Sequence, residues 1–479
     1  MMVEGEAMKG RRLHFIAIGG AGMSGLALVC RSRGAEVTGS DRGESSYMER
    51  LRAAGINPSI GHDAGQVPAG AEVVVSTAVP EDNPELVAAS ERGQRVIHRG
   101  ELLAELCDQK RLLAVAGTHG KTTTAAMCIW ALRAIGADPA FFLGGELRGA
   151  GPGGTATNAD WARGEWVVAE ADESDGSFLK LQPEVAVITN LELDHHSRWS
   201  SLTELSEAFA AFSSPVSGLL TGADVRLPGQ EAQRVVRFAL DEPAGSNPAL
   251  RRRASQDVTP ELLASEIRTA PGGGMRFRAR GAGMDTEVVT GVPGRHNVAN
   301  ALAAIGGLAL AGFDPGVCAA ALADFPGVAR RLELKGTANG ARVYDDYAHH
   351  PTEVAATLEA ARELKPRRLI ADFQPHLYSR TKALASEFGT SLAAADEVAV
   401  LDVYPAREQP VGPLSGVTGL LVAQAVADHS RGRRVWWLPT AEAAAAALRP
   451  RLGEGDIMIT IGAGDIYRLA EALVEEGGE

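Results

Sequence analysis

Cysteine is scarce in this chain, which has 4 in 479 residues. The cysteines are far apart, and no two of them form a C-x-x-C pair. Small secreted domains that depend on disulfides carry many closely spaced cysteines, so that class of protein is excluded. We expect reduced structural thiols of a cytoplasmic protein at Cys30, Cys107, Cys128 and Cys318.

Long apolar runs are also missing. No stretch approaches the ~20 uncharged apolar residues that a helix needs to span a bilayer. The basic N-terminus, the apolar LHFIAI and the later Cys30 together resemble an export signal. Four glycines between residues 19 and 25 interrupt that segment, however, and Val29 is not the small residue expected before a lipidated cysteine. We therefore expect a soluble, cytoplasmic protein with no membrane partner.

An excess of positive charge is missing as well. The chain has 47 basic and 60 acidic residues, a net charge of −13. Such a chain repels a nucleic-acid backbone, so we expect no nucleic-acid partner, whereas local groups and a metal can still bind a small anionic substrate. At 479 residues the chain is too long for one ordinary core, and a prior of about 150 residues per domain predicts roughly three domains.

The most informative stretch is LLAVAGTHGKTTT, residues 112–124. Its apolar start is typical of a buried strand, and the residues after Lys121 have the apolar spacing of a helix. A glycine-rich turn between strand and helix binds phosphate, Lys121 adds a full positive charge, and the hydroxyl of Thr122 or Thr123 can hold Mg²⁺. The spacing departs from GxxxxGK[ST], because Val115 stands where that pattern has glycine. A purely structural turn is the alternative.

A second glycine loop lies near the N-terminus. The strand LHFIAI leads into GAGMSG, a GxGxxG pattern at residues 20–25, and VTGSD then ends a second strand at Asp41. Such a loop presents N–H groups to a pyrophosphate, which can belong to NAD or to a nucleotide-sugar. The pattern alone does not choose between them, and glycines that only allow close packing are the third interpretation.

Polar clusters follow two further strands of the same region. Trp166–Ala169 runs into EADESD, residues 170–175, and VAVITN runs into LELDHH, which ends at residue 196. Ligands of open α/β sheets bind at the carboxyl ends of strands, and carboxylates there can complete a Mg²⁺ site that Thr122 begins. A solvated acidic turn and a surface histidine are the alternatives. We interpret FLGGELRGAGPGG, residues 142–154, as a surface loop.

Structural signals weaken between residues 200 and 285, where turn-rich segments dominate and RRR at 251–253 is expected to be a solvated loop. GRHNVAN, residues 294–300, then opens a helix. We expect its polar residues to contact a base or phosphate, and a role in capping the helix alone is the alternative.

In the last part of the chain, strands alternate with helices again. The expected strands are ARVYDDYA, RRLIADF, EVAVLDVY, RVWWLP and DIMITIGAGDI. Adjacent residues rarely ligate one ion, so His349 and His350 do not predict zinc.

These blocks together resemble the Mur ligase family over nearly the whole chain and in the same order. The resemblance is carried by HFIAIGGAGMSGLA, VTGSD, AVAGTHGKTTT, EADESDGSFLKLQP, GRHNVANALAA, DDYAHHPTEV, FQPHLYSRT and GAGDI. It implies three open α/β domains: a Rossmann-like N-terminal domain that binds a UDP-sugar (11–107), a central P-loop domain that binds ATP and Mg²⁺ (108–328), and a Rossmann-like C-terminal domain that closes on nucleotide and amino acid (329–479).

The activity that the resemblance implies is the ATP-dependent joining of L-alanine to the carboxylate of UDP-N-acetylmuramate through an acyl phosphate, in peptidoglycan precursor synthesis. The implied ligands are ATP, Mg²⁺ and these two substrates, and we expect a monomer or a weak homodimer. A related ligase that attaches a whole peptide is one alternative. An NAD-dependent oxidoreductase built on GxGxxG is another, but it leaves the phosphate loop and the acidic cluster unexplained. A nucleotide-dependent module without ligation is the third.

The site residues follow from the motifs together with the resemblance. The predicted catalytic residues are Lys121, Glu173, His195 and Arg380. The predicted metal ligands are Thr122, Thr123, Glu170 and His195. The nucleotide is predicted to contact Gly117, Thr118, His119, Gly120, Lys121, Thr122, Thr123, His296 and Asn297. The other substrates are predicted to contact Gly20, Ala21, Gly22, Ser40, Asp41, Tyr347, His349, His376 and Arg380.

Two departures from the family's pattern refine this prediction. Leu377 stands where the family often has arginine, which leaves Arg380 as the better candidate for the transferred phosphate. Some sibling ligases hold a second Mg²⁺ with a carbamylated lysine, but this chain has no lysine between Lys180 and Lys335. His195 and Glu170 are therefore the preferred pair of ligands on the metal side of the site.

Overall fold

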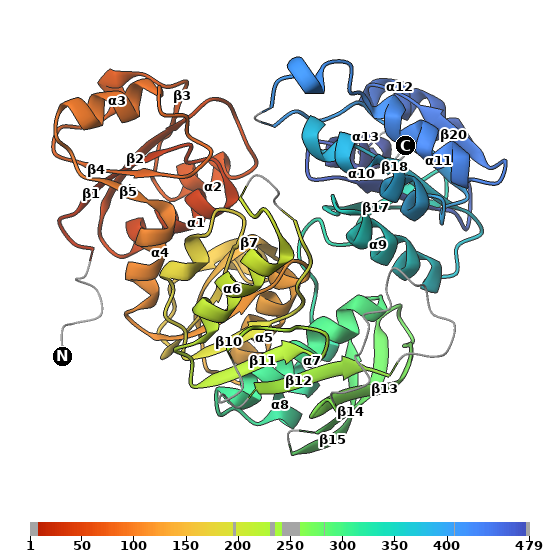
Figure 1. Cartoon of the computed structure of the whole chain (residues 1–479), viewed down its shortest axis with the longest axis horizontal. Coiled ribbons are helices and arrows are strands. Elements are labelled where there is room, and N and C mark those ends of the chain that lie inside the picture. Colours follow the sequence, from red (N-terminus) through yellow and green to blue (C-terminus); the bar gives the residue numbers. More distant parts are fainter. Residues whose placement is uncertain are drawn as a thin grey trace.

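The computed structural model describes residues 8–194, 198–229, 235–241, 259–281, 283–406 and 408–475. These residues form three sheets with helices packed on them, which confirms the prediction of three α/β domains. In Figure 1 the first domain (red to orange) and the C-terminal domain (blue) both lie above the central domain (yellow to green). His195 and the RRR segment lie outside the described residues.

The first domain has a parallel sheet with the strand order β3-β2-β1-β4-β5 over its described residues. Apart from Arg12, the residues of β1 are fully buried, as expected for a central strand with both faces covered. The strand order reverses between β1 and β4, and the glycine loop leaves the carboxyl end of β1 beside that point, where ligands of open sheets bind. The elements are β1 (Arg12–Ile16), α1 (Ala21–Ser32), β2 (Glu36–Asp41), α2 (Met48–Ala53), β3 (Ser59–Ile60), β4 (Glu72–Val75), α3 (Pro84–Glu91), β5 (Val96–His98) and α4 (Arg99–Cys107).

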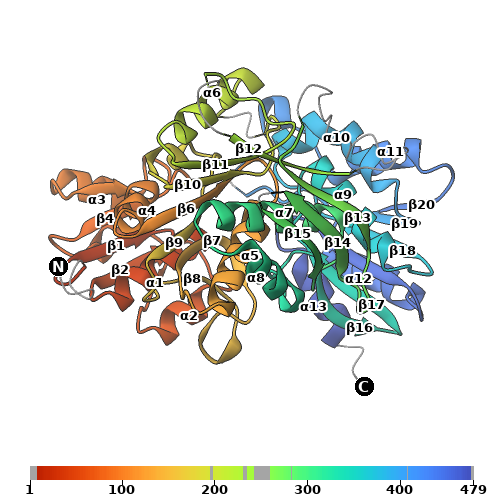
Figure 2. The same cartoon turned by 90° about the horizontal axis from the view of Figure 1, so that it is seen from below.

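The central domain has the strand order β15-β14-β13-β12-β11-β10-β6-β9-β7-β8 in its described part. Helices α5 and α7 pack against each other on this sheet, as Figure 2 shows from below. The elements are β6 (Arg111–Ala116), α5 (Lys121–Ala134), β7 (Ala140–Leu147), β8 (Thr157–Asp160), β9 (Trp166–Glu170), β10 (Val185–Ile188), α6 (Leu202–Ser213), β11 (Gly218–Gly222), β12 (Val235–Leu240), β13 (Leu262–Thr269), β14 (Met275–Gly281), β15 (Met284–Thr290), α7 (Arg295–Leu310) and α8 (Pro315–Ala321).

Two parts of the central domain differ from the prediction. The start of FLGGELRGAGPGG is not a surface loop but belongs to β7, which pairs with β9 in parallel and with β8 in antiparallel. The turn-rich stretch before residue 290 contains the antiparallel strands β13, β14 and β15. In β14, Met275, Phe277 and Ala279 point to the core and alternate with arginines. The surrounding glycines belong to the hairpin turns and obscure this alternation in the sequence.

The C-terminal domain has the strand order β16-β17-β21-β18-β19-β20. The five strands predicted there are present, and β16 is an additional antiparallel edge strand. The elements are β16 (Glu333–Ala338), β17 (Ala341–Asp346), α9 (Pro351–Glu363), β18 (Leu369–Phe373), α10 (Tyr378–Leu392), β19 (Glu397–Val400), α11 (Gly419–His429), β20 (Arg434–Trp437), α12 (Ala441–Leu448), β21 (Ile457–Ile461) and α13 (Tyr467–Glu475).

The three domains are not joined equally. One continuous apolar core contains Phe15 and Leu26 of the first domain together with Ala114 and Phe178 of the central domain. The apolar cores of the C-terminal domain contain only residues of that domain. Its contacts with the central domain include polar pairs, such as Arg380 with Asp194. The C-terminal domain is therefore the part that can move with the least loss of buried apolar surface.

Two predictions from composition can be compared with the structure. All four cysteines are buried and free. No helix in the described segments combines the length and apolar character needed to cross a membrane.

Asp372 on β18 gives a test of the C-terminal core. Its side chain is fully buried, and neither carboxyl oxygen has a hydrogen-bond partner among the residues described. Burial raises the pKa of Asp372 to about 7. The folded state therefore holds this proton more tightly than the unfolded chain, and stability is lost as the pH rises from the unfolded pKa of about 4 to 7, by roughly 1.4 kcal/mol per unit at most.

Because asparagine does not ionise, we expect Asp372→Asn to raise the unfolding temperature much more at pH 8 than at pH 5. Differential scanning calorimetry of both proteins at the two pH values measures this difference. An equal shift at both pH values would show that Asp372 is not a buried neutral acid.

Candidate active site

The phosphate loop joins the carboxyl end of β6 to the N-terminus of α5. Gly117 and Gly120 adopt φ values of +123° and +81°, which L side chains rarely adopt. A Cβ atom would lie 2.2 Å from Thr189 Oγ1 at the first position and 2.4 Å from Asn300 Oδ1 at the second. Both positions thus require glycine, and the backbone turns tightly enough to direct N–H groups at an anion.

The end of β10 holds the loop in this shape. The His119 N–H donates to Asn190 Oδ1 at 2.9 Å, and Asn190 Nδ2 donates to the His119 carbonyl at 2.7 Å. The Thr118 hydroxyl donates to the Glu192 carbonyl at 2.9 Å. These bonds fix the backbone of the loop before any ligand arrives.

Lys121 folds back over the loop. Its Nζ atom donates to the carbonyl oxygens of Gly117 and Thr118 at 2.6 and 3.1 Å and lies 2.9 Å from Glu173 Oε2. Burial opposes the charge of Lys121, but nearby carboxylates, Glu173 first among them, outweigh it and raise its pKa. Burial raises the pKa of Glu173 to about 7 although Lys121 acts against this change.

The acidic cluster after β9 divides into three sets of contacts. Glu170 Oε1 accepts the Thr122 hydroxyl at 3.0 Å, and Glu170 Oε2 accepts the Gly144 N–H at 2.7 Å. Glu173 pairs with Lys121. The remaining two carboxylates, Asp172 and Asp175, pair with Arg99 at 2.9 and 2.7 Å. The structure therefore brings Thr122 and Glu170 together, as expected of two ligands of one cation, whereas His195 lies outside the described residues.

Two pockets lie on either side of this hydroxyl–carboxylate pair. One lies between the first and central domains, and its walls include Gly22, Arg99, Asn158 and Glu170. The other lies between the central and C-terminal domains, and its walls include Gly120, Thr122, Thr123, His296, Asn297 and Arg331. Because Glu170 lines one pocket and Thr122 lines the other, the hydrogen bond between them joins the walls of the two pockets.

The predicted residues of the first domain have different surroundings. Ala21 and Gly22 line the pocket beside Arg99, and Gly20 caps α1. Asp41 accepts the N–H of Gly19 at 2.9 Å, so it shapes the glycine loop. Ser40 is fully buried, and its hydroxyl contacts Glu85 and His62. Ser40 is therefore placed beneath the loop rather than on the surface of the pocket.

His296 and Asn297 lie in the first turn of α7 and line the second pocket. Asn297 Nδ2 donates to the Pro293 carbonyl at 2.7 Å, and its Oδ1 accepts from Asn300 Nδ2 at 3.1 Å. Asn300 in turn accepts the Thr124 hydroxyl at 3.3 Å. This chain of hydrogen bonds joins the pocket wall to the helix that follows the phosphate loop.

His119 lies at the boundary with the C-terminal domain. Its Nε2 atom is 3.3 Å from Glu192 Oε2, and its Nδ1 atom is 3.4 Å from Glu353 Oε1. Burial opposes protonation, but the two carboxylates outweigh it and raise the pKa of His119 to about 9. The ring centroid of His350 lies 5.0 Å from that of His119.

Arg380 reaches the central domain from the first turn of α10. One of its terminal nitrogens donates to Asp194 Oδ1 at 3.3 Å, and both side chains are largely buried. Leu377, which precedes α10, has a φ of +70°, an uncommon conformation for a residue with a bulky side chain. The short connection from β18 therefore enters α10 through a strained residue that sets the direction of its first turn.

The other residues predicted in the C-terminal domain form a row of rings. Tyr347 and His349 have ring centroids 5.4 Å apart, and His349 and His376 are 6.2 Å apart. His376 stacks on Tyr404 at 5.7 Å. Burial lowers the pKa of His349 to about 4, so this imidazole is neutral. His349 faces these rings, while the adjacent His350 faces His119.

Four residues that contact the predicted site have no individual role in the sequence prediction, although Glu192 and Asp194 belong to its LELDHH cluster. Arg99 binds the acidic cluster, Glu192 and Glu353 flank His119, and Asp194 binds Arg380. Asp194 follows the carboxyl end of β10, the position that placed LELDHH among the candidates. Arg99 follows the carboxyl end of β5, where the same signal could have identified it. Glu353 lies in the first turn of α9, where an acidic residue also has the ordinary role of stabilising the helix.

Three protein-family models match this chain. They are described as Mur ligase family, catalytic domain (residues 12–111), Mur ligase middle domain (115–308) and Mur ligase, glutamate ligase domain (330–464).

Relatives and solved structures match over nearly the whole chain. UDP-N-acetylmuramate–L-alanine ligases of Rubrobacter xylanophilus and Kineococcus radiotolerans are each 45% identical over 97% of this chain, covering 99% and 95% of their own lengths. The crystal structure of UDP-N-acetylmuramate-alanine ligase MurC from Thermotoga maritima has a TM-score of 0.81 at 29% identity and covers 97% of this chain and 98% of its own.

The crystal structure of a murein peptide ligase from Psychrobacter arcticus has a TM-score of 0.69 at 24% identity and covers 98% of this chain and 99% of its own. At this identity the match shows only that the two proteins share a fold. Because the three models cover most of the chain and the relatives cover nearly all of it, the chain belongs to the Mur ligase family.

Proposed function

We propose that this protein joins L-alanine to the carboxylate of UDP-N-acetylmuramate and converts ATP to ADP and phosphate, a step in peptidoglycan precursor synthesis. Full-length relatives at 45% identity are named UDP-N-acetylmuramate–L-alanine ligase. The structural observation that supports the proposal is the hydrogen bond of Thr122 to Glu170, which joins the wall of the pocket below the glycine loop to the wall of the pocket of the phosphate loop. A reaction between a nucleotide phosphate and a sugar-linked carboxylate requires two such pockets that adjoin.

The chemistry follows from the weak electrophilicity of a carboxylate. A carboxylate oxygen attacks the γ-phosphorus of ATP, the bond to the β,γ-bridging oxygen breaks, and ADP leaves with the electron pair. The neutral amine of L-alanine then attacks the acyl carbon. The tetrahedral intermediate releases phosphate, and the amine loses its proton, so that an amide remains.

The roles of the three domains are part of the proposal. The first domain, residues 11–107, binds the UDP-sugar at Gly20, Ala21 and Gly22. The central domain, residues 108–328, binds ATP at the phosphate loop with Lys121 on the β- and γ-phosphates, and His296 and Asn297 on the nucleotide. The C-terminal domain, residues 329–479, closes with Arg380 toward the transferred phosphate. In this arrangement Tyr347, His349 and His376 face the incoming substrate, and Glu173 orients Lys121 or the amine.

The donor atoms between the two pockets fit Mg²⁺. The ion takes oxygen ligands, and the Thr122 hydroxyl lies 3.0 Å from a carboxylate oxygen of Glu170. We assign Thr122, Thr123 and Glu170 to one Mg²⁺ and His195 to a second. When bound, the ions neutralise charge on the phosphates. The residues of the chain hold the loop backbone, orient Lys121 and close the pocket.

Phosphate release tests the proposed reaction. With ATP, Mg²⁺ and UDP-N-acetylmuramate, release should require an amino acid and should be fastest with L-alanine compared with glycine, L-serine or a tripeptide. Release without the UDP-sugar or without an amino acid would indicate a nucleotide-dependent module, and a preference for the tripeptide would indicate the peptide ligase. The oxidoreductase alternative needs tight NAD(H) binding, which the same preparation can be tested for.

Location and assembly complete the proposal. A reaction that consumes ATP and a UDP-sugar takes place in the cytoplasm, where both substrates are found. A monomer or a weak homodimer stays our prediction.

A further inference from the structure

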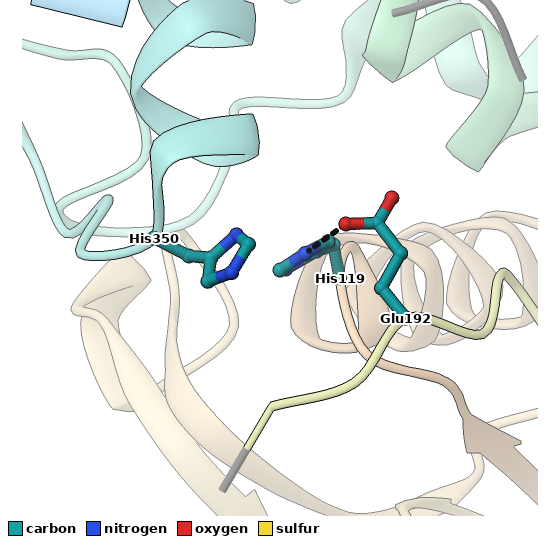
Figure 3. Close-up of side chains that lie close together, drawn as sticks. All are labelled: His119, Glu192 and His350. Atoms are coloured by element: carbon teal, nitrogen blue, oxygen red, sulfur yellow. Dashed lines mark hydrogen bonds and ion pairs between the residues drawn. The ribbon is translucent and has the colours of Figure 1, made fainter. Parts of the chain in front are cut away.

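Two histidines and a glutamate meet at the boundary between the central and C-terminal domains (Figure 3). His119 belongs to the phosphate loop, Glu192 follows β10, and His350 caps α9. One ligand atom from each side chain lies within 4.8 Å of the other two. We propose that these three side chains form a binding site for a divalent transition-metal ion, and that Zn²⁺ is the ion that fits their donor atoms best.

Two of the three donor atoms already have the separation of ligands in a metal site. With bonds of about 2.0–2.2 Å, two ligand atoms of tetrahedral Zn²⁺ lie about 3.3–3.5 Å apart. His119 Nε2 and Glu192 Oε2 are 3.3 Å apart. Figure 3 shows the His350 ring beside the His119 ring, on the side away from Glu192. The three ligand atoms all lie within 4.8 Å of one another, so rotation of the His350 side chain toward Glu192 would complete three ligands and leave a fourth position for water.

Further contacts orient each ligand. His119 Nδ1 lies 3.4 Å from Glu353 Oε1, the carboxylate contact that metal-bound histidines commonly make through their second nitrogen. The Thr352 hydroxyl donates to Glu192 Oε2 at 3.0 Å. The Thr352 N–H donates to His350 Nδ1 at 3.4 Å, which leaves Nε2 of His350 for an ion.

Charge and ligand type also suit a transition metal. Glu192 and Glu353 both face the cluster, so two negative charges balance a divalent ion that displaces the proton from His119 Nε2 to solvent. Two imidazoles favour Zn²⁺, Cu²⁺ or Ni²⁺ over Mg²⁺, which prefers oxygen ligands. The cluster is thus chemically distinct from the Thr122–Glu170 pair. It also differs from a site made of adjacent histidines, because His349 faces Tyr347 and His376.

An ion at this position has a mechanical consequence. His119 and Glu192 come from the central domain and His350 from the C-terminal domain, so the ion ties the two domains together. His119 and Glu192 also line the pocket beside the phosphate loop. The bound ion therefore inhibits turnover, because it occupies the wall of the nucleotide pocket.

Cobalt binding to the intact protein tests the site. Co²⁺ substitutes for Zn²⁺ and absorbs visible light strongly when its coordination is tetrahedral, and an excess of Mg²⁺ keeps the oxygen sites filled. We expect one Co²⁺ per chain with a tetrahedral spectrum that Zn²⁺ abolishes. His350→Asn and Glu192→Gln should each weaken binding by about tenfold or more. His429→Asn, at an exposed histidine on α11, is the matched control and should leave the affinity unchanged.

The same proteins give a second readout. Zn²⁺ should inhibit turnover of the wild type at concentrations that fill the site, and His350→Asn should need about tenfold more Zn²⁺ for the same fractional inhibition, relative to its own rate with Mg²⁺ alone. The proposal is overturned if the wild type binds no Co²⁺, if the spectrum is octahedral, or if His350→Asn and Glu192→Gln both bind Co²⁺ as tightly as the control. Circular dichroism establishes that each variant is folded.

Discussion

Lys121→Ala is expected to lower kcat by about 10³-fold, equivalent to about 4 kcal/mol of barrier, because a cation fixed at the transferring phosphate stabilises the charge that develops there. The structure holds Lys121 in place with two loop carbonyls and Glu173, so the ammonium group is positioned before the nucleotide binds. Steady-state kinetics with all three substrates measures the loss.

Lys382→Ala is the matched control for this variant. Lys382 is exposed on α10, and its Nζ atom donates to the Pro413 carbonyl at 2.8 Å, away from both pockets. Its removal should leave kcat unchanged. Amide formation by Lys121→Ala at the rate of the control would refute the assignment of the phosphate loop.

Arg380→Ala is expected to lower kcat by about 10²- to 10³-fold while the affinity for the UDP-sugar stays unchanged, because we propose that the arginine binds the transferred phosphate and not the ligand of the first domain. Calorimetric titration with UDP-N-acetylmuramate separates the two effects. Arg380→Lys should recover part of the rate, since the charge returns without the planar guanidinium.

Arg434→Ala is the control for the arginine prediction. Arg434 lies on β20, has a half-exposed side chain and lies 3.6 Å from Glu397, so its loss should change only a local ion pair. Unchanged turnover of Arg380→Ala would transfer the phosphate-binding role to another cation. Arg331, which lines the nucleotide pocket, would be the next residue to test.

The sequence predicted the elements whose signals are local. Buried parallel strands such as β6 and β10 are continuous apolar runs, and a strand–glycine turn–helix sequence has few alternatives. The hairpin of β13, β14 and β15 was missed because its alternation is interrupted by the glycines of its own turns. The strand β7 was missed because two glycines interrupt its apolar run, Gly144 where the backbone approaches Glu170 and Gly145 where it approaches Thr122 and Val328.

Only part of the site could be predicted, because some of its contacts form between domains. Residues at strand ends converge because parallel strands share an edge, so Thr122 and Glu170 were identified as neighbours. Contacts between domains depend on how separate folding units dock. Nothing in the local sequence places Arg99 against Asp172, or Glu353 against His119. Arg99 lies in no motif, and an acidic residue in the first turn of a helix, such as Glu353, already has an ordinary role.

The pairing of each active-site cation with a carboxylate has a consequence for selectivity. Lys121, Arg99 and Arg380 each contact a carboxylate of the protein: Glu173, Asp172 and Asp194. A carboxylate that belongs to the protein competes for the cation at a high effective concentration. Any incoming anion must displace this carboxylate before it can bind the cation. Free inorganic phosphate gains one contact for each displacement and competes poorly. A polyphosphate or a nucleotide-sugar can displace several carboxylates in one binding event, so we expect the site to discriminate against the small anion that its own reaction releases.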